Sequence, residues 1–170
     1  LRREGFRVIQ KDAAIDVLNL FLSRSYLGAA CERARVRAER AAANPGAGSK
    51  DFLRHYHEAG AWAGYVADHL PEALKVVRNP DEFYDARRYH WAVTILDLAC
   101  ELCALPHYPS RLTCATCESP ADLSLPGLLA ASENTDTNLY YDVFERSVVP
   151  DILALNPLLI GLSATYHFQH

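Results

Sequence analysis

The residues best suited to chemistry are four clustered cysteines, which form two Cys-x2-Cys pairs: Cys100 with Cys103, and Cys114 with Cys117. The spacing between the pairs matches that of a zinc ribbon, in which four thiolates hold Zn²⁺ tetrahedrally. The first pair, however, continues an apolar helical stripe, in which cysteine packs as a small hydrophobic residue. Neither pair carries the glycine that is common in zinc knuckles. We therefore expect core and loop cysteines, with a zinc site as the alternative.

The spacing of the histidines and aromatic residues does not indicate a further site. His55 and His57 are two residues apart and so face different sides of a helix, which is poor geometry for a shared metal ion. We expect both to be solvated surface residues. The tryptophans and most tyrosines fall at helical spacings, so packing accounts for them. The sequence has no glycine-rich phosphate loop and no Ser/His/Asp arrangement, which leaves nucleotide hydrolysis and acyl transfer without support.

A different candidate site lies near the end of the chain, where Ser163 and Thr165 follow an apolar run. The run, residues 158–162, comes directly after Pro157 and shows no polar alternation. Proline cannot lie inside a helix, and an unbroken apolar run of this length is typical of a strand buried on both faces. Such strands form parallel sheets, and ligands bind beyond the carboxyl ends of their strands. The pattern predicts a small-molecule site at Ser163 and Thr165.

A second strand is expected at residues 6–10, followed by Asp12, which can cap the next helix. Most of the chain separates the two strands, whereas a simple parallel crossover needs only about 30 residues in all. The excess must be inserted helical structure. The fold class expected is therefore α/β: a partial parallel sheet with a large, mainly helical insertion.

Apolar spacing divides the rest of the chain into helices that are interrupted at prolines. We expect breaks near Pro71 and Pro80, and we expect Pro150 to kink or split the last helix. Residues 106–126 are turn-rich, with one short extended piece at residues 111–113. The expected helices cover residues 13–26, 29–43, 81–105 and 140–155, with a further helical segment beginning at residue 51.

Composition bounds the class of protein. The chain has 170 residues and a mass of 18.9 kDa, which is long enough for one ordinary domain with a core. Half of its residues are hydrophobic and 22% are charged. A net charge of −4 gives no reason to expect a nucleic-acid partner. No apolar run is long enough to span a bilayer, and the first residues lack the apolar part of a signal peptide, so the cytoplasm is the default location. The chain contains no Met, and we expect a piece of a longer protein, cut at both ends.

Three stretches of the chain share a further pattern: residues 1–8 with Asp12, residues 89–112, and residues 138–169, which include Pro-Leu-Leu-Ile-Gly-Leu-Ser at 157–163. Together they resemble the cobalamin-binding N-terminal region of B12-dependent radical SAM proteins. The resemblance implies a partial Rossmann-like parallel sheet. Its expected parts are a strand–helix start at residues 1–28, a helical insertion at 29–137, and a helix with the buried strand at 138–170.

The resemblance also implies a corrinoid ligand on the strand ends. Ser163 and Thr165 then line the pocket of its lower nucleotide, where hydroxyls can pair with otherwise unpaired polar atoms. Gln169 and Asp12 are further candidate contacts, although a helix cap explains Asp12 equally well. The cobalt-ligating Asp-x-His-x-x-Gly motif is absent from the sequence, so the cobalt would have no protein ligand. The Cys-x3-Cys-x2-Cys motif is absent too, which assigns S-adenosylmethionine and the 4Fe–4S cluster to a missing C-terminal radical SAM domain.

Two functions remain open from the sequence. The first is the cobalamin-binding part of a radical SAM enzyme, which positions a corrinoid for methyl transfer or a related radical step. The second is a helical interaction or regulatory module without a corrinoid, in which Cys100, Cys103, Cys114 and Cys117 hold a structural zinc.

Overall fold

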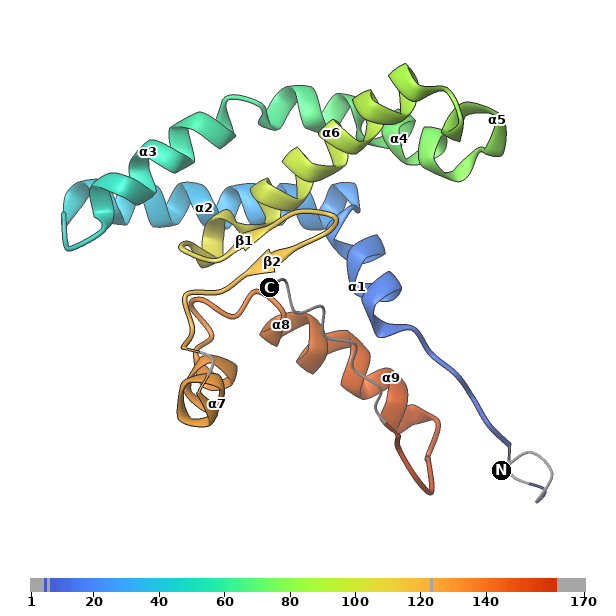
Figure 1. Ribbon diagram of the computed structural model, residues 1–170. Helices are drawn as coiled ribbons and strands as arrows, with labels where there is room; N and C mark the ends of the chain where they lie inside the picture. Colours follow the sequence, from blue (N-terminus) through green and yellow to red (C-terminus); the bar gives the residue numbers. More distant parts are fainter. Residues whose placement is uncertain (1–4, 6, 123, 162–170) are drawn as a thin grey trace. The chain divides into compact units, whose positions relative to one another are not determined.

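The structure, a computed structural model, describes residues 5, 7–122 and 124–161, and most of these are helical (Figure 1). The chain divides into two compact units, Leu1–Leu139 and Tyr140–His170. The helices of the first unit are α1 (Ala13–Phe21), α2 (Arg24–Ala43), α3 (Ser49–Gly60), α4 (Ala63–Arg78), α5 (Pro80–Phe83), α6 (Ala86–Ala104) and α7 (Leu125–Glu133). A 3₁₀ turn, η2 (Leu105–His107), extends α6.

Polar side chains start several of these helices. The Asp12 carboxylate accepts hydrogen bonds from the backbone N–H groups of Ala14 (3.0 Å) and Ile15 (3.2 Å) at the start of α1. Asp85 does the same for the first turn of α6, and the Ser23 hydroxyl caps α2. These bonds satisfy N–H groups that have no partner within the helix. The helix starts therefore follow from local sequence.

The core of the first unit forms where α4 packs along α6, and Figure 1 shows the two helices side by side. From α4, the buried residues are Val66, Leu70, Ala73 and Val76. From α6, they include Ile95, Leu96 and Ala99, followed by Cys100 and Cys103. Helix α2 contacts α3 and α6, and apart from Leu27 its buried residues are alanines, so that its backbone can approach closely. One helical face of α6 is thus enclosed by its neighbours.

A small hairpin follows α6. Its strands are β1 (Arg111–Leu112) and β2 (Cys117–Glu118), which pair antiparallel, with Leu112 opposite Cys117. The Thr113 hydroxyl accepts from the N–H groups of Ala115 and Thr116 and so closes the turn. Strand β1 packs against α6. The short extended piece predicted near residue 111 is confirmed.

The predicted partial Rossmann-like parallel sheet is wrong. Among the described residues, the only sheet is the two-stranded antiparallel hairpin. Residues 7–10 and 157–161 have no regular structure, and the side chains of Leu158 and Leu159 are 90% and 79% exposed rather than buried. Asn156 adopts the left-handed region (φ 46°) and turns the chain as α9 (Val149–Ala154) ends. An apolar run forms a strand only when another strand supplies its hydrogen bonds, and no described segment does so here.

Two prolines behave differently from one another. The expected break at Pro71 is wrong, because α4 continues through it. A proline inside a helix costs about 3 kcal/mol, whereas each large apolar side chain that α4 buries contributes about 1.5–3 kcal/mol, so packing outweighs the loss. Pro150 lies where the last helix changes from π-helical to α-helical geometry, although no non-helical residue separates the two parts. In the second unit, α8 (Tyr141–Val143) leads into a π-helical turn, η3 (Phe144–Val148), and Pro150 lies in the first turn of α9.

Truncation of Ile95 tests the α4–α6 core. Ile95 is 2% exposed, and we expect Ile95→Ala to lower the free energy of unfolding by about 2–5 kcal/mol through lost burial and a cavity. Urea denaturation followed by circular dichroism measures the change. The matched control is Ile15→Ala, since Ile15 on α1 is 58% exposed and should change stability little. Equal effects of the two substitutions would contradict the proposed core.

Candidate functional site

The two cysteine pairs do not converge on one point. Cys100 on α6 lies beside Cys114 in the hairpin turn, with a distance of 3.8 Å between the two Sγ atoms. Cys103, one turn further along α6, instead directs its thiol to the backbone carbonyl of Phe21 on α1, at 3.3 Å. Cys117 is exposed on β2. Over the described part of the chain, no three or more His, Cys, Asp or Glu residues are grouped to hold a metal ion. This arrangement does not provide the four ligands of a structural zinc site.

The environments of the thiols separate them chemically. A hydrogen bond from Cys100 lowers the pKa of the exposed Cys114 thiol, because it stabilises the Cys114 thiolate. The pKa of Cys100 is raised, first by this bond to Cys114 and then by burial. Burial raises the pKa of Cys103 to about 12 and also raises that of Cys31. Cys114 therefore loses its proton before the buried cysteines do.

The residues expected to contact a corrinoid fall in two groups. Asp12 is described, and its carboxylate caps α1, which is one of the two roles expected for it. Ser163, Thr165 and Gln169 lie outside the described residues. The segment that leads to them is exposed and apolar: Leu158 and Leu159 are followed by Ile160, whose side chain is half exposed.

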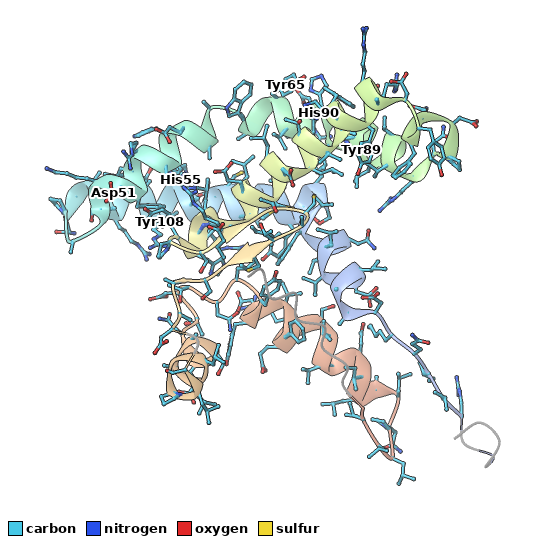
Figure 2. All side chains as sticks on the ribbon, in the orientation of Figure 1. Asp51, His55, Tyr65, Tyr89, His90 and Tyr108 are labelled. Carbon is cyan, nitrogen blue, oxygen red and sulfur yellow. The ribbon has the colours of Figure 1, made fainter. Side chains whose placement is uncertain are left out.

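His55 is not the solvated residue expected from the sequence. Its side chain is only 11% exposed, and its Nε2 atom lies 3.4 Å from an Oε1 atom of Glu101 on α6. Figure 2 shows His55 close to Tyr108, and the two rings are 5.6 Å apart. The Arg37 guanidinium lies over the ring of Phe52 and donates to the carbonyls of Pro106 and Tyr108. These contacts tie α2, α3 and the end of α6 together, so packing accounts for the group.

A set of partly exposed rings, which we call the aromatic face, covers one side of α4 and α6. Its members are Trp62, Tyr65 and His69 on α4, and Trp91 on α6. The Tyr65 and His69 rings stack at 4.1 Å, and the Trp91 indole N–H donates to the Tyr65 hydroxyl at 3.4 Å. Figure 2 shows Tyr65 beside the start of α6. Helical spacing had suggested that packing accounts for the tryptophans and tyrosines, but Trp62 and Tyr65 are exposed.

A shallow depression of about 220 Å³ adjoins the aromatic face. Glu72 of α4 and Arg87, Arg88 and Trp91 of α6 line it. Arg88 pairs with Glu72 at 3.2 Å and also with Glu82. The depression therefore combines an indole ring with guanidinium groups, the side chains that most often anchor protein–protein contacts. Its position depended on how α4 packs on α6, so the sequence alone gave no signal for it.

Comparisons of the chain with known proteins find no relative. A scan against protein-family models finds no match, and neither the curated proteins nor the solved structures contain a significant match. Along the described segments, no helix is both long and apolar enough to cross a membrane.

Alkylation tests the assignment of the thiols. The thiolate is the nucleophile, so a lowered pKa makes Cys114 more reactive at neutral pH, whereas Cys103 stays protonated until strongly alkaline pH. We expect iodoacetamide to modify Cys114 well before Cys103 and Cys31 in the folded protein. The rate at Cys114 should rise with pH and level off below the ordinary thiol pKa of about 9.

The measurement is timed alkylation across a pH series, followed by peptide mapping. The unfolded protein in denaturant is the control, since unfolding removes the burial and hydrogen bonding that distinguish the thiols. Native modification of Cys103 at the same rate as Cys114 would contradict the assignment.

Proposed function

We propose that this chain contributes to corrinoid binding in a cobalamin-dependent radical SAM enzyme. The observation that carries the proposal is the element at residues 156–165, Asn-Pro-Leu-Leu-Ile-Gly-Leu-Ser-Ala-Thr, which resembles the corresponding element of that family. The parallel sheet that the family would place here is not part of the proposal. What remains is an apolar segment followed by two hydroxyl side chains.

The exposure of the apolar segment is consistent with a binding role. Leu158 and Leu159 are almost fully exposed, and Ile160 is half exposed. Covering apolar surface is favourable by about 25 cal/mol for each Å² removed from water, so a run of three such side chains gains from a ligand or polypeptide laid over it. The flat face of a corrin ring, with its methyl groups, is a suitable cover. Single exposed apolar residues need no explanation, but a contiguous run does.

The chain's own residues would then bind and orient the cofactor. The hydroxyls of Ser163 and Thr165 can donate to or accept from polar atoms of the lower nucleotide, and the Gln169 amide can do both. Asp12 is engaged as the cap of α1, so we give it no part in binding. A bound corrinoid supplies methyl transfer or related radical chemistry, with S-adenosylmethionine and a 4Fe–4S cluster held by a separate domain, while this chain supplies position and excludes water.

Direct binding tests the corrinoid proposal. We expect the purified protein to retain hydroxocobalamin through gel filtration, with corrinoid absorbance in the protein peak. The double variant Ser163→Ala/Thr165→Ala should bind about fivefold or more weakly, because two hydrogen bonds contribute about 0.5–1.5 kcal/mol each. Isothermal titration calorimetry gives both affinities.

The matched control is Ser147→Ala/Thr135→Ala, which removes one serine and one threonine hydroxyl from exposed positions outside the element. It should bind like the unaltered chain. Absence of retained corrinoid, or equal weakening by the two double variants, would overturn the proposal.

A second function is favoured by the aromatic face. Exposed tryptophan and tyrosine beside arginine are the side chains enriched at binding hot spots. Glu72, which pairs with Arg88, also lines the depression, so Arg87 and the Trp91 ring are the groups that offer a place for an acidic or aromatic side chain. This supports a helical interaction module whose partner is a protein segment with apolar and carboxylate side chains. The structural zinc considered from the sequence is not part of this version, because the described residues contain no group of three or more candidate metal ligands.

Peptide titration tests this second function. Both tryptophans of the chain lie on the aromatic face, so their fluorescence reports directly on binding there. Within a panel of synthetic helical peptides that combine leucine or phenylalanine with glutamate, we expect saturable fluorescence changes. Trp62→Ala should lower the affinity for the tightest-binding peptide of the panel at least tenfold, which is the effect of losing a hot-spot residue.

Tyr84→Ala is the control. Tyr84 follows α5, its side chain is strongly exposed, and it lies outside the aromatic face. It should leave the affinity unchanged. If no peptide alters the fluorescence, or if both variants bind equally, the aromatic face is not a docking surface.

A further inference from the structure

The cysteine contact between α6 and the hairpin is unlike the other sulfur contacts in the described chain. The two Sγ atoms of Cys100 and Cys114 are 3.8 Å apart, and they come from different elements. A disulfide bond has a length of about 2.05 Å, so a small movement of one side chain brings the sulfurs into bonding distance. The hairpin turn that carries Cys114 is short and exposed, which allows such a movement.

The two thiols also differ in the way that a reactive pair requires. Cys114 is exposed, so a small oxidant reaches it, and the backbone N–H of Cys114 is held by the Asp97 carboxylate of α6 at 2.9 Å. Cys100 is fully buried directly behind it. An accessible thiol that reacts first, next to a second thiol that resolves the product, is the arrangement found in redox-sensing cysteines. The lowered pKa of Cys114 adds reactivity to this geometry.

We propose that Cys100 and Cys114 form a reversible disulfide bond when the protein meets a peroxide. The proposal concerns the α6–hairpin contact alone and does not depend on the corrinoid or on the aromatic face. It assigns a modification site to two cysteines that the spacing of the Cys-x2-Cys pairs had divided between separate pairs.

The reaction proceeds in two steps. In the first, the Cys114 thiolate attacks one oxygen of hydrogen peroxide, the O–O bond breaks, and the departing hydroxide takes a proton to become water, which leaves a sulfenic acid. In the second, the Cys100 sulfur attacks the Cys114 sulfur, the S–S bond forms and the S–O bond breaks. The hydroxide that leaves takes the Cys100 proton and becomes a second water. Two thiols and one peroxide thus give one disulfide and two waters, and a dithiol reductant reverses the change.

The bond would fix the hairpin to α6. In the reduced protein, the turn is held by the hydrogen bond between Cys114 and Asp97 and by the packing of β1 on α6. A covalent link from residue 100 to residue 114 closes a short loop and restricts the unfolded chain, so oxidation should raise the melting temperature of the protein by several degrees.

Peptide mapping of the unaltered protein tests the proposal without any substitution. Trypsin cuts after Arg88, Arg111 and Arg146, which places Cys100 and Cys103 on residues 89–111 and Cys114 and Cys117 on residues 112–146. After brief treatment with stoichiometric hydrogen peroxide and blocking of free thiols, we expect these two peptides to be joined. Fragmentation should place the bond between Cys100 and Cys114, and a reductant should separate the peptides.

Two variants sharpen the test. Cys114→Ser, at an exposed position, should abolish the link and the rise in melting temperature, whereas Cys117→Ser, in the same hairpin, should preserve both. Circular dichroism confirms that each variant is folded. Bonds within the separate peptides, a bond through Cys103 or Cys117, or a link between two molecules on a non-reducing gel would each overturn the proposal.

Discussion

Enclosure of one face of α6 is the constraint on which the first unit depends. Helix α4 packs along it, α2, α3 and α1 contact it, and β1 lies against it near its end. The buried residues of α6 extend from Ala92 to Ala104 and include both Cys100 and Cys103. Because so many elements meet this single helix, α6 contributes to the position of each of them, although α2 also packs directly on α1, α3 and α4. The hairpin, the depression beside Trp91 and the His55–Glu101 contact all derive their geometry from it.

Most of the helical parts were predictable because their signals are local, although α7 was not among the expected helices. Apolar residues at a spacing of 3.6, and caps such as Asp12 and Asp85, act within a few residues of one another. The parallel sheet was predicted wrongly because a strand is a relation between distant segments. The run after Pro157 has the composition of a buried strand, yet composition cannot supply a partner, and in the described chain Leu158 and Leu159 face solvent. Pro71 is a case in which a local signal is overruled by packing. The proline does disfavour a helix, but the packing of α4 on α6 outweighs its effect.

The candidate sites depended on tertiary contacts in the same way. Spacing along the chain joined Cys100 to Cys103 and Cys114 to Cys117, whereas the fold sends Cys103 toward α1 and brings Cys114 to Cys100. Residues three apart on a helix are not at the same angle, so each thiol of the first pair meets a different neighbour. Which neighbour Cys100 meets is decided by the hairpin, whose turn is fixed to Asp97. The aromatic face was hidden for a related reason, because helical spacing predicts that rings share a side of a helix but not whether another element covers that side.

The thiol contact and the aromatic face can act independently, and the geometry of α6 gives the reason. Trp91 and Cys100 are separated by about two and a half helical turns, so their side chains leave α6 on opposite sides. Trp91 meets Tyr65 and His69 of α4, whereas Cys100 meets the hairpin that follows α6. A covalent bond on the hairpin side changes the mobility of the turn without moving the rings, provided that α6 itself stays straight. Since one face of α6 is enclosed by packing from Ala92 to Ala104, a local change at Cys100 is opposed by the surrounding core, and its effect should remain at the hairpin.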